Sequence, residues 1–186
     1  MTDDFLYRYE VKGIQSYIMA TDRLREMMGA SALVEQLAGL FERARESVGL
    51  GGGEVVLVPA AAGGASLKVR ASEESKLDAL MAGWPLIVSR HAPGLQLVQS
   101  KVDADHGFDA LFRALQQARS QFEADLPEAG PVVMRAPRTG LPASELFRDP
   151  DGGWVGLDPG TARRRIASER DALGERIDPE HRWVVD

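Results

Sequence analysis

The sequence predicts an α+β fold in which short strands alternate with amphipathic helices. Residues 5–11 alternate aromatic and polar side chains, which is typical of a strand with two different faces. Directly after them, apolar residues recur at three- and four-residue steps from Ile14 to Ala44, which predicts helix. Residues 54–59 and 66–70 then flank a glycine pair, as in a β-hairpin.

The first strand passes into the first helix through Gly13 with almost no loop. A helix N-terminus leaves backbone N–H groups unpaired and carries a partial positive charge, so it favours phosphate. Gly13 permits a close backbone approach at that point. Gln15 and Ser16 in the first turn either bind phosphate or cap the helix. Further along, the small residues Gly29-Ala30-Ser31 predict close packing against a neighbouring element, or a kink.

After the hairpin, Ser72 is a plausible N-cap for a second helix over residues 73–91. Pro85 lies inside this helix and is expected to kink or interrupt it. Residues 95–102 alternate as a further strand, and residues 108–122 carry an apolar stripe typical of a third helix.

Beyond residue 125 the character of the chain changes. Proline and glycine punctuate the segment without sustained periodicity. A charged helix is expected over residues 161–176, followed by a strand-like end at residues 181–186.

The order up to Val102 is strand, helix, strand, strand, helix, strand. Two βαβ units that share an antiparallel sheet give the ferredoxin-like βαββαβ arrangement, which is also the core of polymerase palms and nucleotide cyclases. The crossover rule places both main helices on one face. We therefore predict a palm-like ferredoxin domain over residues 1–125. Residues 126–186 are predicted to form an irregular and helical C-terminal extension, which begins with a proline- and glycine-rich linker.

Composition excludes several kinds of site. The chain has no cysteine, which removes disulfides, thiolate zinc sites and cysteine nucleophiles. The three histidines, His91, His106 and His181, form no metal-binding pattern. The net charge of −6 argues against a broad electrostatic grip on nucleic acid. The arginines at 135, 138 and 163–165 either touch an RNA backbone or, more commonly for such charge runs, form a solvated face.

Targeting signals are also missing from the sequence. The N-terminus is acidic and lacks the order of a signal peptide. No apolar run approaches the roughly 20 residues that span a bilayer. We therefore expect a soluble cytoplasmic protein without membrane contacts.

Two-metal nucleotidyl transfer on a palm needs carboxylates on adjacent strands. Glu10 is the candidate acid of the first strand, where it is either an auxiliary acid or an ordinary salt-bridged carboxylate. The hairpin turn AAAGGAS carries no carboxylate. We therefore expect no catalysis by this chain alone, no bound metal and no zinc.

The same turn carries the candidate nucleotide-binding residues. Gly63 and Gly64 either form a tight hairpin or leave bare backbone that a base or phosphate approaches. Ser66 is a weaker candidate beside them. The predicted nucleotide-facing set is Gly13, Gln15, Gly63, Gly64 and Ser66.

The segment EVKGIQSYI, followed by LREMMGASALVEQL, resembles the opening of the first palm domain in the large polymerase-cyclase subunit of type III CRISPR effector complexes. VVLVPAAAGGASLKV is similar to that family's glycine-rich, acid-free hairpin, and RAPRTGLPA resembles the linker beyond the first palm. The resemblance covers about residues 5 to 145. The positions that carry it are Glu10, Gly13, Ile14, Gln15, Leu24, Arg25, Gly29, Ala30, Ser31 and Leu33.

The resemblance implies half of a composite active site. In the family a second palm with a GGDD hairpin carries the two-metal chemistry that joins ATP into cyclic oligoadenylates, and the first palm helps to hold the second ATP. Here the sequence ends at HRWVVD before such a palm, and the cysteines that often bind zinc in the family's linker are missing. The implied function is ATP binding without catalysis in antiviral defence, with Mg²⁺ supplied by a GGDD-bearing palm or partner subunit and RNA met through an effector complex.

Two other readings stay open. A degenerate ferredoxin-like module could serve protein–protein assembly without binding nucleotide. Its candidate anchors are Trp84, Trp154 and Trp183, although a buried core role is expected for at least Trp84. An RNA-binding module of the same fold is disfavoured, because the predicted strands lack stacking aromatics in the pattern of RNA-recognition sheets and the protein is acidic.

Overall fold

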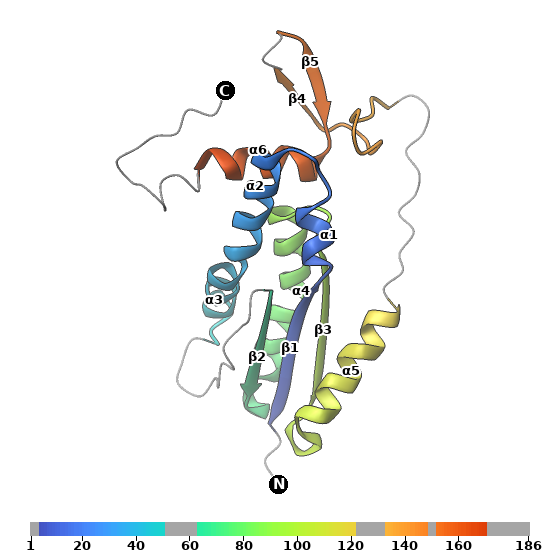
Figure 1. The fold of residues 1–186 in the computed structure, drawn as a ribbon. Coiled ribbons are helices and arrows are strands. Elements are labelled where there is room, and N and C mark those ends of the chain that lie inside the picture. Colours follow the sequence, from blue (N-terminus) through green and yellow to red (C-terminus); the bar gives the residue numbers. More distant parts are fainter. Residues whose placement is uncertain (1–3, 51–62, 122–132, 149–151, 171–186) are drawn as a thin grey trace, which may run out of the picture. The chain divides into compact units, whose positions relative to one another are not determined.

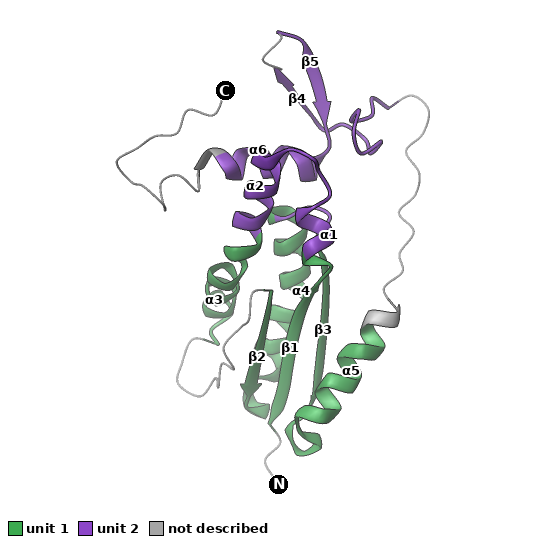
Figure 2. Cartoon of the chain, in the orientation of Figure 1, with its two compact units in different colours: residues 1–14, 34–91, 95–124 green, residues 15–33, 92–94, 125–186 purple. Residues whose placement is uncertain are grey.

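The computed structural model describes residues 4–50, 63–121, 133–148 and 152–170, and the chain is α+β, with a small antiparallel sheet and several helices (Figure 1). It divides into two compact units (Figure 2). Unit 1 comprises residues 1–14, 34–91 and 95–124, and unit 2 comprises residues 15–33, 92–94 and 125–186. Residues 15–33, which the predicted first domain included, thus group with the C-terminal part of the chain.

Unit 1 is built on a three-stranded sheet with the first strand in its centre (Figure 1). β1 (Phe5–Lys12) pairs antiparallel with both β2 (Gly64–Val69) and β3 (Gln96–Asp103). The predicted strand over residues 54–59 lies outside the described residues.

One face of this sheet carries the aromatic core. Tyr7 and Tyr9 of β1 are fully buried beneath α3 (Leu37–Ser47) and α4 (Glu74–His91). The Tyr9 ring lies 4.6 Å from the Phe41 ring of α3 and 5.1 Å from the Trp84 ring of α4. Such contacts add to the large apolar area that each ring buries. The two helices therefore share one face, as the crossover rule predicts.

Burial raises the pKa of both tyrosines, and the neighbouring Tyr9 raises that of Tyr7 further. The Tyr7 hydroxyl donates to Gln99 Oε1 at 3.0 Å, and Gln99 Nε2 donates to the Met81 carbonyl of α4 at 2.7 Å. This chain of bonds satisfies polar groups that would otherwise be costly to bury.

α4 follows a short 3₁₀ turn, η1 (Ala71–Glu73), and it continues through Pro85. Of the two effects expected of Pro85, a kink or an interruption, the interruption is therefore wrong. The packing of Leu77, Leu80, Trp84 and Val88, all buried on one side of α4, outweighs the lost backbone bond.

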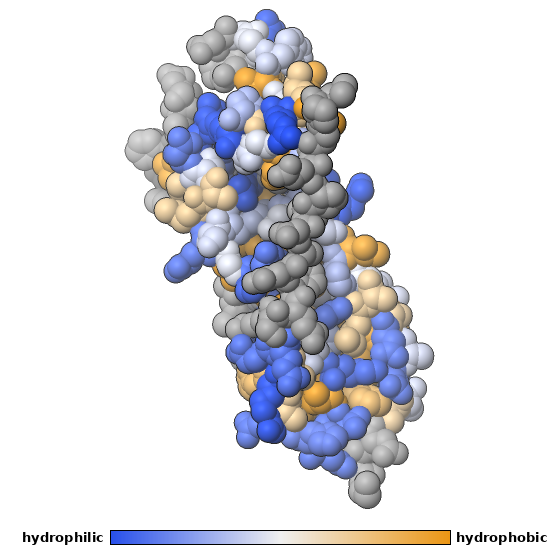
Figure 3. All heavy atoms as spheres, turned by 90° about the vertical axis from the view of Figure 1, so that its right-hand side faces the viewer, coloured by the Kyte–Doolittle hydropathy of each residue, from blue (hydrophilic) through white to orange (hydrophobic). Residues whose placement is uncertain are grey.

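The other face of the sheet carries polar side chains such as Arg8 beside the buried Leu6 and Val98. It is partly covered by α5 (Gly107–Gln121), which follows η2 (Ala104–His106). Arg8 alternates with the core tyrosines, and its guanidinium lies 5.1 Å from the centre of the Phe112 ring of α5. Leu111 and Leu115 are the buried residues of this helix, and Phe112 is partly exposed. Figure 3 shows apolar and polar surface interspersed where α5 lies.

Unit 2 combines helices with a two-stranded hairpin. It contains most of α1 (Ile14–Ile18) and α2 (Leu24–Glu35), the strands β4 (Glu145–Arg148) and β5 (Trp154–Leu157), and α6 (Pro159–Arg170). The hairpin was not predicted, because its four-residue strands are too short to show a period. The predicted helix over residues 161–176 is α6 as far as it is described, and residues 181–186 lie outside the described part.

The Gly29-Ala30-Ser31 segment lies inside α2 at a helix–helix contact. A Cβ placed on Gly29 would lie 1.8 Å from the backbone oxygen of Arg164 in α6. Close packing, one of the two predicted reasons for these small residues, is therefore confirmed. The predicted helical stretch from residue 14 to 44 breaks elsewhere, between α1 and α2 and again at Gln36 before α3. No helix within the described ranges is long and apolar enough to cross a membrane.

Candidate functional site

Four of the predicted site residues lie at one end of the unit 1 sheet. Glu10 of β1 is the cross-strand partner of Gly64 in β2, and the Val11 amide donates to the Gly63 carbonyl at 2.6 Å. Gly13 follows the last residue of β1 with a φ of 67°. This left-handed conformation suits glycine and turns the chain sharply into α1.

Internal packing explains the glycine pair. Gly63 has a φ of 96°, and a Cβ there would lie 2.6 Å from Ile14 Cδ1. A Cβ on Gly64 would lie 3.0 Å from the Tyr9 carbonyl oxygen. Both glycines thus let the start of β2 approach β1 and α1 closely. Residues 51–62, the rest of the predicted hairpin, lie outside the described part of the chain.

Ser66 and Glu10 are linked through Arg8, which the predicted nucleotide-facing set does not include. Arg8 Nη1 donates to Ser66 Oγ at 2.8 Å, and Arg8 Nε lies 2.9 Å from Glu10 Oε1. Glu10 is therefore a salt-bridged strand carboxylate, the plainer of its two predicted roles. The signal for Arg8 was in the sequence, since Arg8 and Glu10 are two apart in a strand and share a face.

Gln15 is placed differently from the glycines. It belongs to unit 2 and lies in the short helix α1, with its side chain exposed. Ser16 beside it is exposed as well.

Unit 2 contains a buried carboxylate held by arginines. Glu26 in the first turn of α2 is 1% exposed and accepts a hydrogen bond of 2.6 Å from the Thr21 hydroxyl. Its Oε1 accepts from Arg165 Nε of α6 at 3.0 Å, and Arg138 Nη1 lies 3.7 Å from Oε2, the oxygen that Thr21 also binds. A carboxylate this deeply buried requires such partners, because an unpaired charge there is strongly destabilising.

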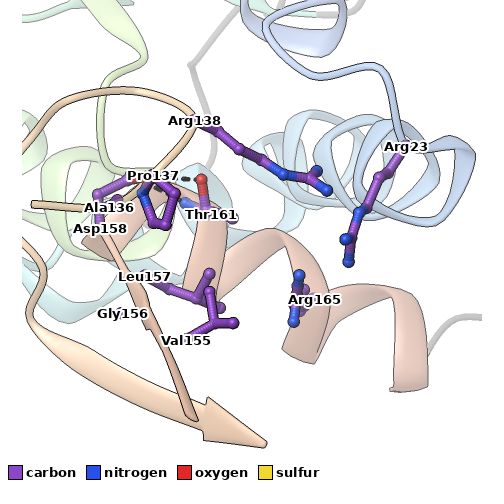
Figure 4. Close-up of a pocket in the computed structure, with 10 residues that line it drawn as sticks. All are labelled: Arg23, Ala136, Pro137, Arg138, Val155, Gly156, Leu157, Asp158, Thr161 and Arg165. Carbon is purple, nitrogen blue, oxygen red and sulfur yellow. Dashed lines mark hydrogen bonds between the residues drawn. The ribbon is translucent and has the colours of Figure 1, made fainter. Parts of the chain in front are cut away.

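A pocket of about 180 Å³ opens beside this carboxylate (Figure 4). Its cationic side is formed by Arg23 at the start of α2, Arg138 in the loop before β4, and Arg165 of α6. Figure 4 shows these three side chains reaching toward the same space from three separate segments. The other lining residues are Ala136, Pro137, Val155, Gly156, Leu157, Asp158 and Thr161.

Asp158 caps the N-terminus of α6. Its Oδ1 accepts from the Thr161 amide at 3.0 Å, and its Oδ2 accepts from the hydroxyls of Thr161 at 2.7 Å and Thr139 at 3.0 Å. Burial by itself would raise the pKa of Asp158, but the hydrogen bonds from Thr161 and Thr139 outweigh it, so the pKa is lowered. The helix end is thus occupied by a carboxylate of the chain itself.

The interpretation of residues 163–165 as a solvated charge run is wrong for Arg164 and Arg165. Arg164 is 6% exposed, with its guanidinium 4.3 Å from the centre of the Tyr17 ring, and Arg165 binds Glu26. Burial raises the pKa of Tyr17 in spite of the nearby Arg164 charge. Sequence reasoning missed the pocket because Arg23, Arg138 and Arg165 are far apart in the chain and meet only through the fold.

The described residues contain no group of three or more histidine, aspartate or glutamate side chains that could hold a metal ion. In comparisons with known proteins, the chain matches no protein-family model and no curated protein sequence.

Proposed function

We propose that this chain is a nucleotide-binding, palm-like domain of a CRISPR-polymerase-type antiviral protein of the cytoplasm and is not catalytic by itself. The observation that carries the proposal is the central position of β1 between two antiparallel neighbours. In a ferredoxin-like palm the first strand is central, and the pairings of β2 and β3 are those of its third and fourth strands.

Support for nucleotide binding comes from the chemistry at the end of β1. Gly13 leads from the central strand into α1 and is exposed, as is the side chain of Gln15. These two residues are the ones we propose to contact the ATP phosphates, while Gly63, Gly64 and Ser66 shape the end of the unit 1 sheet. ATP brings a triphosphate that binds Mg²⁺, and a GGDD-bearing palm or partner subunit would supply the metal-binding acids. RNA would be met only through an effector complex.

Calorimetric titration with ATP, with and without Mg²⁺, tests the proposal. Gln15→Ala should weaken ATP binding about fivefold, the effect of losing one hydrogen bond to a ligand. Gln116→Ala, an exposed glutamine of α5, is the matched control and should bind ATP like the wild type. A wild-type titration that stays flat into the millimolar range would remove nucleotide binding from the proposal.

A role in protein–protein assembly without nucleotide is the second candidate, and one observation favours it. Trp154 of β5 is 70% exposed, and Leu146 of β4 and Met134 are also largely exposed. Exposed aromatic residues are typical anchors of protein interfaces. Trp84 is buried in the core and does not serve as such an anchor, and Trp183 lies outside the described residues. A flat ATP titration together with sedimentation of a stable complex would favour this function.

A further inference from the structure

We propose that the arginine-lined pocket of unit 2 is a binding site for a phosphate monoester. The site lies apart from the end of β1 where ATP binding is proposed, and it does not rest on that function. All of its lining residues belong to unit 2.

The first argument is the convergence of three guanidinium groups on one small pocket (Figure 4). Arg165 is partly neutralised by Glu26 at 3.0 Å. Arg138 has only a 3.4 Å contact with Asp22, which is 90% exposed, and a 3.7 Å contact with Glu26. Arg165 is largely buried, whereas Arg23 and Arg138 are exposed. Like charges gathered in one place repel one another unless an anion lies between them. A phosphate oxyanion would provide that anion, and its geometry matches the planar fork of arginine.

Arg23 supplies the second argument. Its guanidinium makes no ion pair or hydrogen bond with any residue that the structure describes, although it lines the pocket. Its carbonyl accepts from the Met27 amide, which places Arg23 at the N-terminus of α2. A cation is unfavourable at that end of a helix, where the dipole attracts anions. Folding therefore gives no electrostatic reason for an arginine here, whereas a bound anion does.

The charge of the surroundings points the same way. Residues 15–33, 133–148 and 152–168 contain eight arginines and four carboxylates, while the whole chain carries a net charge of −6. Of the carboxylates near the pocket, Asp158 is committed to capping α6 and Glu26 is shared by Arg138 and Arg165. Asp22 and Glu26 thus accompany Arg138 and Arg165, and Arg23 is the arginine of the three that has no carboxylate partner among the described residues.

Size and the remaining wall define the ligand. Ala136, Pro137, Val155 and Leu157 give the pocket an apolar side opposite its charges. Pockets for drug-sized ligands start at about 300 Å³. At about 180 Å³ this pocket suits a phosphate with a small apolar or planar group attached, or the phosphorylated end of a larger molecule.

Titration calorimetry with phenyl phosphate at neutral pH tests the site, because this probe combines a phosphate with a small ring. We expect saturable binding, weakened about tenfold by Arg23→Ala, the loss expected for a charged hydrogen bond. Arg23→Lys keeps the charge but not the fork, and should lie between the two. Arg148→Ala removes an exposed arginine of the same unit that does not line the pocket, and should change the affinity less than twofold.

Three outcomes would overturn the proposal. One is the lack of saturable wild-type binding up to about 10 mM phenyl phosphate, the weakest affinity worth calling a site. Another is an equal loss in Arg23→Ala and Arg148→Ala, which would show unspecific charge attraction. The last is that the protein binds a single-stranded RNA without a terminal phosphate and that phenyl phosphate does not displace this RNA. The surface would then be a nucleic-acid contact.

The variants also separate this site from the proposed ATP site. Gln15→Ala should leave phenyl phosphate binding unchanged, and loss of binding in that variant would place the phosphate at α1 instead and refute the inference. Arg23→Ala should unfold at the same urea concentration as the wild type or at a slightly higher one, because the side chain has no partner in the described structure and a cation is unfavourable at this helix end. A lower midpoint would show that Arg23 serves the fold, which would also count against the proposal.

Discussion

Replacing Gly29 by alanine tests the contact that joins α2 to α6. Within a helix, alanine is favoured over glycine by about 1 kcal/mol, so an unhindered substitution would stabilise the protein. Here the new Cβ would lie 1.8 Å from the backbone oxygen of Arg164, and that contact must open to at least 3.0 Å. The obstacle is helix backbone and not a flexible side chain, so α6 has to move as a whole. Forced overpacking costs about 1–3 kcal/mol, and this contact belongs at or above the upper end.

Gly39→Ala is the matched control in α3. Its Cβ would meet only Arg43 Nη1 at 3.8 Å, an ordinary contact with the end of a mobile side chain. Urea unfolding followed by circular dichroism should show a loss of about 2 kcal/mol for Gly29→Ala. The same measurement should show a gain of up to about 1 kcal/mol for Gly39→Ala. If both variants are stabilised alike, the close approach of α6 to α2 is wrong.

Three further substitutions probe unit 2. Arg165→Ala should lower the free energy of unfolding by about 3 kcal/mol in urea titrations, because it leaves the buried carboxylate of Glu26 without its main ion-pair partner. Arg148→Ala should lower the same free energy by less than about 0.5 kcal/mol. Equal losses would contradict the buried ion pair. Because the pKa of Asp158 is lowered in the folded state, the stability that this carboxylate contributes is complete above its unfolded pKa near 4 and is lost as the pH falls through the folded pKa. Asp158→Asn should therefore flatten the decline of the free energy of unfolding between about pH 5 and pH 2. An unchanged slope would speak against the cap. Trp154→Ala should change the urea midpoint very little, since the side chain is 70% exposed, and a large loss would mean that the indole is buried.

The elements of unit 1 could be predicted from the sequence because each carries its own periodicity. The alternation of Tyr7 and Tyr9 with Arg8 and Glu10 gives both the strand and its two faces. The strand predicted over residues 66–70 is β2, which begins two residues earlier, at Gly64. The uninterrupted path of α4 through Pro85 could not be read locally, because burial of Trp84 and its neighbours decides it.

The sites were predictable only where their residues are close in sequence. Arg8, Glu10 and Gly13 lie on one short segment, and the order of strands brings Gly64 beside them. The pocket of unit 2 joins three distant segments, so no spacing in the sequence announces it. A run of arginines at 163–165 suggests solvent exposure, and only the packing of α6 reveals that Arg164 and Arg165 are held by contacts within the fold.

Gly63→Ala can separate a role of the glycine pair in packing from direct contact of its backbone with a nucleotide. The substitution forces alanine into a φ of 96° and pushes its Cβ to 2.6 Å from Ile14 Cδ1. The backbone strain costs about 1–2 kcal/mol, and the clash adds to it. Ile14→Ala removes the clashing atom. In a double-mutant cycle, the double variant should therefore regain the stability that the clash costs, but not the stability that the backbone strain costs.

ATP binding per folded molecule then decides the role of Gly63. One possibility is that Gly63 serves only the packing of β2 against Ile14. The folded molecules of the Gly63→Ala/Ile14→Ala double variant should then bind ATP with unchanged affinity, because no group that touches the ligand is altered. If the bare backbone itself faces the nucleotide, affinity falls even where the clash has been relieved. The internal contacts seen at both glycines favour the first outcome. A tenfold loss of affinity at full folding would require the nucleotide to lie against β2.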